Sequence, residues 1–169
     1  MRFVTKPVIR SMTEEDIPHI AEWMARDAHW QRYGMREESI RTDFDDALAR
    51  GDLLLVADAE LPARGFAWCE LNGMFGSQAY LKRIGVDPAF AGRNIGGLLL
   101  DRVEVKVSET GPDTLFLLVS DFNEGAQRFY WRRGYQQIGE FPGLAVPGVT
   151  ELLFSKALEC LSYSADDPL

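Results

Sequence analysis

The stretch that decides the fold is IGVDPAFAGRNIGGLLL, residues 84–100, in which a short apolar segment ends at a proline and a glycine-containing loop opens a helix. Apolar side chains then recur every fourth position, as one face of a helix requires: Ile95, Leu99, Val103 and Val107. Glycines let a backbone approach a ligand closely, and the first N–H groups of a helix have no partner within it. The stretch therefore predicts an anion-binding loop at a helix start.

The spacing of this loop excludes two common phosphate-binding motifs. A P-loop needs G-x-x-x-x-G-K-[ST], and GRNIGGLL (92–99) has neither the lysine nor the hydroxyl. A dinucleotide fingerprint needs G-x-G-x-x-G directly after the first strand, whereas this loop reads G-x-x-x-G-G in the middle of the chain. Neither motif fits this loop.

The segments around the loop predict a mixed α/β (α+β) protein. A continuous apolar run, 113–122, follows the helix and is typical of a strand buried on both faces, as in a parallel βαβ unit with the strand at 78–87. Residues 26–39 show no clean periodicity. We expect the other strands at 3–10, 52–60, 64–73, 135–141 and 150–158, with a turn around Pro62 and Gly65, and the other helices after Thr13, at 37–50 ending at Gly51, and at 124–134.

Composition fits one domain spanning residues 1–169, with a tail from about 160 that we expect to be frayed. The net charge of −8 argues against a nucleic-acid partner and mildly favours a cationic substrate. Cys69 and Cys160 show no metal-ligand spacing, so we interpret both as free thiols in a reducing compartment. The N-terminus lacks a secretory signal and no apolar run could span a membrane, so we expect a cytoplasmic protein without a membrane partner.

A second block, NEGAQRFYWRRGY (123–135), follows the buried strand. On a helix, Asn123, Ala126 and Tyr130 share one face, and the small alanine leaves room for a thin chain such as pantetheine. Together the two blocks resemble the GNAT superfamily of N-acetyltransferases, with the closest match from about 79 to 135. The sequence departs from the pattern at Ala91, where Arg or Gln is usual, and at Asn94, where glycine is usual; asparagine is the residue that best replaces glycine in left-handed geometry.

The resemblance implies a central mixed sheet of about seven strands flanked by about four helices. It also implies direct transfer of an acetyl group from acetyl-CoA to an amine, without a metal or a covalent enzyme intermediate. Tyr130 resembles the family's general acid toward the leaving sulfur. The cofactor-binding residues that the resemblance implies are Ile84, Gly85, Val86, Gly92, Arg93, Asn94, Ile95, Gly96, Gly97, Asn123, Ala126, Phe129 and Tyr130. Of the helix arginines Arg128, Arg132 and Arg133, one suffices to meet phosphate.

The sequence leaves the general base and the acceptor open. Glu70 ranks first as the base, because the family places a base at this kind of strand position; the alternatives are ordered water and the side chains Asp121, Tyr80, Glu37 and His29. An aromatic lid from Trp23, His29, Trp30 and Tyr33 is expected over a small-molecule or peptide primary amine. Dimers are common in the family, so a homodimer is one expectation. A non-catalytic acyl-CoA-binding regulatory module is the alternative function, and an unrelated α+β protein is a third.

Overall fold

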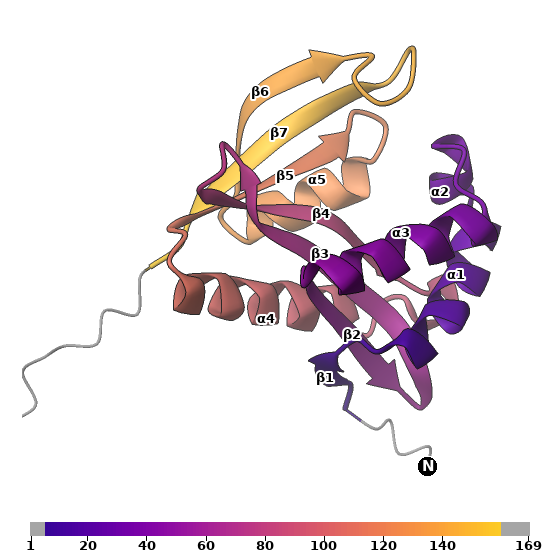
Figure 1. Ribbon diagram of the computed structural model, residues 1–169. Coiled ribbons are helices and arrows are strands. Elements are labelled where there is room, and N and C mark those ends of the chain that lie inside the picture. The colour runs from indigo at the N-terminus through magenta and orange to yellow at the C-terminus, as the bar shows by residue number, and fades with distance from the viewer. Residues whose placement is uncertain (1–5, 160–169) are drawn as a thin grey trace, which may run out of the picture.

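The computed structural model describes residues 6–159 and contains one seven-stranded sheet in the order β1-β2-β3-β4-β5-β7-β6 (Figure 1). The strands are β1 (Val8–Ser11), β2 (Leu53–Ala59), β3 (Leu61–Met74), β4 (Gln78–Val86), β5 (Thr114–Ser120), β6 (Gln136–Pro142) and β7 (Thr150–Ala157). The helices are α1 (Ile17–Arg26), α2 (Ala28–Arg32), α3 (Glu37–Arg50), α4 (Ile95–Thr110) and α5 (Glu124–Arg132). The predicted mixed α/β architecture is confirmed, with α4 crossing between the parallel strands β4 and β5.

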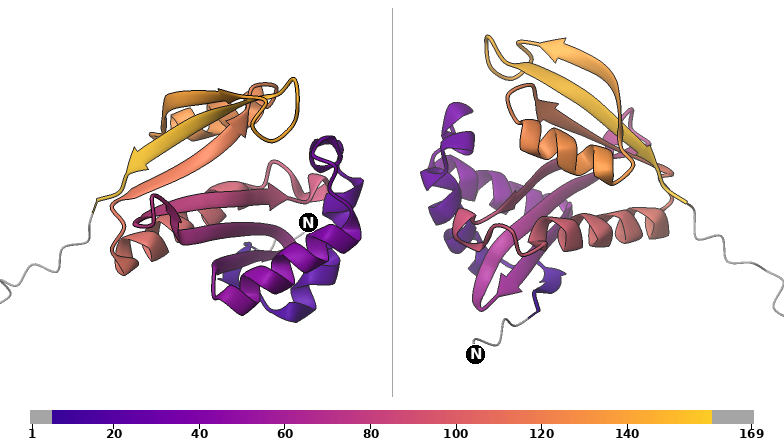
Figure 2. Two further views of the ribbon diagram at one scale, coloured as in Figure 1. Left: turned by 45° about the horizontal axis from the view of Figure 1, so that its top comes forward. Right: turned by 180° about the vertical axis from the view of Figure 1, so that it is seen from behind.

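The strands bury both faces because their side chains alternate. In β2, Leu55 and Ala57 belong to the core under α4 and α5, whereas Leu54 and Val56 belong to a second core under α1 and α3. Figures 1 and 2 show α4 and α5 on one side of the sheet and α1 and α3 on the other. Each face of the sheet therefore has its own hydrophobic core.

A β-bulge separates the two halves of the sheet. In the ladder with β3, Cys69 lies opposite Leu81 but Trp68 lies opposite Arg83, so Lys82 is an extra residue in β4. Such a bulge bends its strand. The parallel pairing of β4 with β5 also stops at this point, with Leu81 opposite Leu117 as the last pair. Beyond it the two strands diverge toward α2, as the left view of Figure 2 shows.

The structure corrects one expectation and leaves others outside its range. The turn predicted around Pro62 and Gly65 is wrong: the chain reverses at Glu60, whose φ is 63°, and Gly65 lies within β3 opposite Ala57. The short helix α2 lies in the segment without periodicity, and residues 6–159 contain five α-helices, in line with the expectation of about four. The start of the predicted strand at 3–10, the tail from 160 and Cys160 lie outside the described residues.

No helix within residues 6–159 combines the length and the apolar character that crossing a membrane requires. Cys69 is a free, buried thiol, and burial raises its pKa to about 12.

Candidate functional site

A cavity of about 290 Å³ lies where β4 and β5 diverge. Its walls come from α2, the middle of β4 (80–84), the end of β5, one face of α5, the connection before β7 and the start of β7. The bulge at Lys82 is the physical reason for the opening, because without pairing beyond Leu81 and Leu117 the two strand edges face each other across open space. Backbone N–H and C=O groups on such edges are free to bind an extended chain between them.

The residues of the second sequence block line one side of this cavity. Asn123, Ala126 and Tyr130 all contribute to the wall, as their common helix face predicted. Asn123 also caps α5, because its Oδ1 accepts a hydrogen bond from the Ala126 N–H at 3.1 Å. The amide nitrogen of Asn123 remains for a ligand.

Tyr130 holds its ring in the core and its hydroxyl at the cavity. Only 5% of the residue is exposed, and the ring lies 5.1, 5.5 and 6.4 Å from the rings of Phe129, Tyr135 and Phe154. The hydroxyl makes no hydrogen bond within residues 6–159, yet it is not sealed off among the buried unpartnered atoms. Burial, together with the nearby Tyr80, raises the pKa of Tyr130 above that of a free tyrosine, so the hydroxyl keeps its proton at neutral pH.

The N-terminus of α4 lies beside this wall. Asn94 has a φ of 58°, which confirms the left-handed geometry predicted for it, and its C=O accepts the first helical hydrogen bond from the Leu98 N–H at 3.1 Å. The N–H groups of residues 95–97 are therefore unused by the helix. A Cβ built on Gly96 would lie 3.7 Å from Val86 Cγ2 and 3.9 Å from Phe129 Cζ, so the helix start meets both the end of β4 and α5.

Basic side chains gather next to this helix start, around a cleft of about 490 Å³. The cleft is lined by Arg132, Arg133 and Lys156 together with Asn94 and Phe129. Arg133 pairs with Asp101, and Lys156 Nζ pairs with Glu104 at 2.8 Å, whereas Arg132 forms no ion pair within residues 6–159. Arg132 is therefore the cation of this cleft that is free to meet a phosphate group, in a chain whose overall charge is −8.

The other two predicted arginines point elsewhere. Arg93 Nη1 donates to Glu60 Oε1 at 3.0 Å, and Arg128 Nη1 donates to Glu124 Oε2 at 3.2 Å. Both ion pairs are exposed, so little holds these side chains in place.

The opposite end of the cavity is aromatic and acidic. His29, Trp30 and Tyr33 come from α2 and its end, and Glu151 comes from β7. The Tyr33 hydroxyl donates to Glu151 Oε1 at 2.7 Å and also contacts the Ser120 hydroxyl. Burial lowers the pKa of His29, so its imidazole is neutral near neutral pH.

The two ends of the cavity lie on opposite faces of the sheet. Val119 and Phe154 belong to the core under α4 and α5, so their strand neighbours Ser120 and Leu153 point to the other face, toward α2. Ser120 and Glu151 are directly opposite in the β5–β7 ladder and therefore share that face. The gap between β4 and β5 thus connects the α5 side of the sheet with the α2 side.

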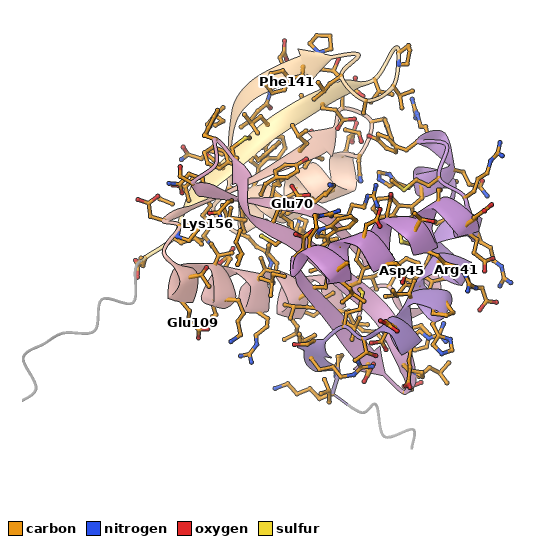
Figure 3. All side chains as sticks on the ribbon, in the orientation of Figure 1. Arg41, Asp45, Glu70, Glu109, Phe141 and Lys156 are labelled. Carbon is orange, nitrogen blue, oxygen red and sulfur yellow. The ribbon has the colours of Figure 1, made fainter. Side chains whose placement is uncertain are left out.

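The structure does not bring Glu70 into the cavity. Its carboxylate accepts a hydrogen bond from Lys82 Nζ at 2.6 Å, and it is absent from the lining; Figure 3 labels it on β3. Asp121 accepts from the Thr150 N–H at 3.1 Å and Glu37 pairs with Arg41 at 2.6 Å, both away from the lining.

Tyr80 and His29 do line the cavity. Burial raises the pKa of Tyr80 to about 12, so this hydroxyl keeps its proton. Of the side chains considered as the base, His29 is the one that faces the cavity in a form able to accept a proton.

The sequence interpretation missed Glu151, Ser120 and Lys156. All three lie at strand ends, where a polar residue among apolar ones is ordinary. The signal that could have found Glu151 is an acidic residue inside the run VTELLF (149–154), because a charged side chain there must face either solvent or a site.

Comparison with known proteins places this geometry in a family. A sequence model described as the acetyltransferase (GNAT) family matches residues 17–135. Mycothiol acetyltransferase of Clavibacter sepedonicus is 30% identical over 134 residues, which is 76% of this chain and 42% of that protein. Mycothiol acetyltransferase of Mycobacterium sp. (strain JLS) is 28% identical over 117 residues, 67% of this chain and 37% of that protein. The chain spans less than half the length of these curated relatives.

Solved structures share the fold at low sequence identity. Ribosomal-protein-alanine N-acetyltransferase from Brucella melitensis superposes with a TM-score of 0.74 at 18% identity, covering 89% of this chain and 99% of that chain. The protein yncA of Salmonella typhimurium, described as an acetyltransferase with its cofactor acetyl-CoA, gives a TM-score of 0.72 at 15% identity, covering 98% of this chain and 100% of that chain.

Proposed function

We propose, since the chain belongs to the acetyltransferase (GNAT) family, that it transfers an acetyl group from acetyl-CoA directly to a primary amine. The single observation that carries this proposal is the meeting of the two sequence blocks. The start of α4, with its free N–H groups, meets the end of β4 at Val86 and α5 at Phe129. The adjacent face of α5, with Asn123 and Tyr130, lines the gap in the sheet.

The residues present suit acetyl-CoA. The N–H groups of the loop from Gly92 to Gly97, with Arg132 of the cleft, would hold its phosphates. The open edge of β4 from Ile84 to Val86 and the amide of Asn123 would hold the pantetheine arm. When bound, acetyl-CoA supplies an activated thioester, so the protein needs to orient it and to manage two protons.

Tyr130 and His29 are the groups that we assign to these protons. The Tyr130 hydroxyl faces the cavity and keeps its proton, so it is the general acid that protonates the leaving sulfur. His29 is neutral and lies at the other end of the cavity, so it replaces Glu70 as our assignment of the base that takes a proton from the amine. No covalent enzyme intermediate is needed.

The names of the relatives bear on the acceptor. One group of relatives is named for mycothiol, a small molecule, and one structural neighbour for the alanine of a ribosomal protein. We propose a small-molecule or peptide primary amine, because the cavity is aromatic and contains a carboxylate at its α2 end.

A thiol-release assay tests this function. The protein is incubated with acetyl-CoA and a panel of amines: ethanolamine, 2-phenylethylamine, spermidine, S-methylcysteine amide and the peptide Ala-Gly-Gly. We expect amine-dependent release of CoA thiol. At one hundred times its Kd, acetyl-CoA should raise the free energy of unfolding by about 2.7 kcal/mol, which is measured as a higher Tm. A Tm shift with no thiol release from any amine would favour the regulatory module, and no shift at all would overturn both.

A further inference from the structure

Glu151 is a buried carboxylate that the proposed chemistry does not use. Only 5% of it is exposed, and it lines the cavity at its α2 end. Its Oε1 accepts the hydrogen bond from Tyr33, whose hydroxyl is fixed in turn by Ser120. Its Oε2 makes no hydrogen bond with any of residues 6–159, and it is not among the atoms sealed from the cavity. One oxygen is therefore held in place and the other is left for a ligand.

Within residues 6–159, Glu151 forms no ion pair with a cationic side chain. Lys82 and Arg83 line the same cavity, but Lys82 pairs with Glu70 at 2.6 Å and Arg83 with Asp43 at 2.7 Å. The guanidinium of Arg32 lies over the Phe122 ring at 3.7 Å from its centroid. A buried carboxylate without a cationic partner is costly, so a position of this kind fits a cation brought by a ligand.

The surroundings of Glu151 are aromatic on several sides. Tyr33 contacts it from the end of α2, and Tyr80 on β4 lines the same cavity. His29 lies 5.6 Å from the Tyr33 ring and is neutral. Aromatic side chains and one carboxylate together form a suitable site for an ammonium group.

We propose that Glu151 binds the ammonium group of the acceptor, with Tyr33 and Ser120 as its positioning residues. This inference rests on the proposed function and adds the specificity element to it. The acceptor enters from the α2 face of the sheet and acetyl-CoA from the α5 face, and Glu151 selects amines that are cationic over neutral molecules of the same shape.

The test compares Glu151→Gln with wild type, using Glu140→Gln on the exposed part of β6 as the matched control. Steady-state kinetics with the best amine of the panel separates KM from kcat. Calorimetry on the CoA-saturated protein compares 2-phenylethyltrimethylammonium with 2-phenylethanol, which have similar shape and different charge. The acetyl-CoA-induced Tm shift reports that each variant is folded and binds its cosubstrate.

In Glu151→Gln the KM for the amine should rise about 10- to 100-fold, as expected for the loss of a charge-assisted contact. The preference for the trimethylammonium probe over the alcohol should disappear, while the acetyl-CoA shift stays within a factor of two. Tyr33→Phe should give a smaller increase in KM, because the carboxylate remains but is no longer held.

A KM within twofold of wild type, or a preserved preference for the cation in Glu151→Gln, would overturn the assignment. The calorimetric comparison does not need turnover. If wild type releases no thiol with any amine, the proposed function fails, and the cation preference of wild type against Glu151→Gln still decides whether the carboxylate binds an ammonium group.

Discussion

Replacing Tyr130 with phenylalanine should separate catalysis from stability. The ring that packs against Phe129, Tyr135 and Phe154 is unchanged, and the lost hydroxyl has no hydrogen-bond partner in residues 6–159, so we expect a stability change of about 0–1 kcal/mol. Loss of a general acid typically costs about 10²–10⁴ in rate. At 1.36 kcal/mol per tenfold change, that corresponds to about 3–5 kcal/mol of transition-state stabilisation.

The assay measures kcat by thiol release, stability by urea unfolding, and acetyl-CoA affinity by the shift in Tm. We expect kcat to fall at least a hundredfold while affinity changes less than threefold. Tyr130→Ala is the contrasting variant, because it removes a buried ring and should cost about 3–5 kcal/mol of stability. A kcat for Tyr130→Phe within threefold of wild type would remove the acid role, whatever the stability.

Four further variants test the loop, the strand and one ion pair. Gly96→Val should abolish the acetyl-CoA-induced Tm shift, because its branches would fill the space between β4 and α5, whereas Gly96→Ala fits at van der Waals distance and should keep most of the shift. Gly85→Ala should cost about 1–3 kcal/mol in urea unfolding, since the new Cβ would lie 2.9 Å from a buried ring carbon of Phe66; a stability equal to wild type would contradict the tight packing. Burial acts to raise the pKa of Asp16, but hydrogen bonds from Arg10 and Thr13 hold it below 3.8, so this carboxylate stabilises the fold above pH 3.8 and the contribution is lost as pH falls through the lowered pKa. In Asp16→Asn, the free energy of unfolding measured in urea should therefore depend less on pH below about pH 4 than in wild type. An unchanged dependence on pH would show that the hydrogen bonds of Asp16 do not stabilise the fold.

The sequence predicted the parts of the site that depend on local backbone chemistry. Glycine and asparagine adopt left-handed backbone geometry more readily than other residues, so their presence at a helix start predicts that geometry. Asn94 adopts it, as expected. Gly51 likewise ends α3 with a φ of 77°. The face formed by Asn123, Ala126 and Tyr130 follows from helical geometry alone, and the cavity wall confirms it.

The sequence could not predict the features that depend on distant partners. The helix α2 is too short to show a period, so its aromatic residues gave no sign of which face they occupy. Glu70 was a reasonable base by its strand position, but whether a carboxylate faces a cavity or a lysine depends on the neighbouring strand, and Lys82 supplies the partner. Glu151 could not be recognised from the sequence, because its partner Tyr33 and the neighbouring Ser120 come from distant segments that only the fold brings together.

The extra residue in β4, Lys82, keeps the gap between β4 and β5 open. Up to Leu81, the side chains of β4 that face the core under α4 and α5 have odd residue numbers. The bulge at Lys82 reverses this alternation, so that Ile84 and Val86 face the same core as Leu81. Deleting Lys82 would remove the bulge, so that β4 could continue to pair with β5 beyond Leu81 and close the gap between the two strands. The proposed meeting of two reactants from opposite faces of the sheet thus depends on one residue more in β4 than a regular ladder holds.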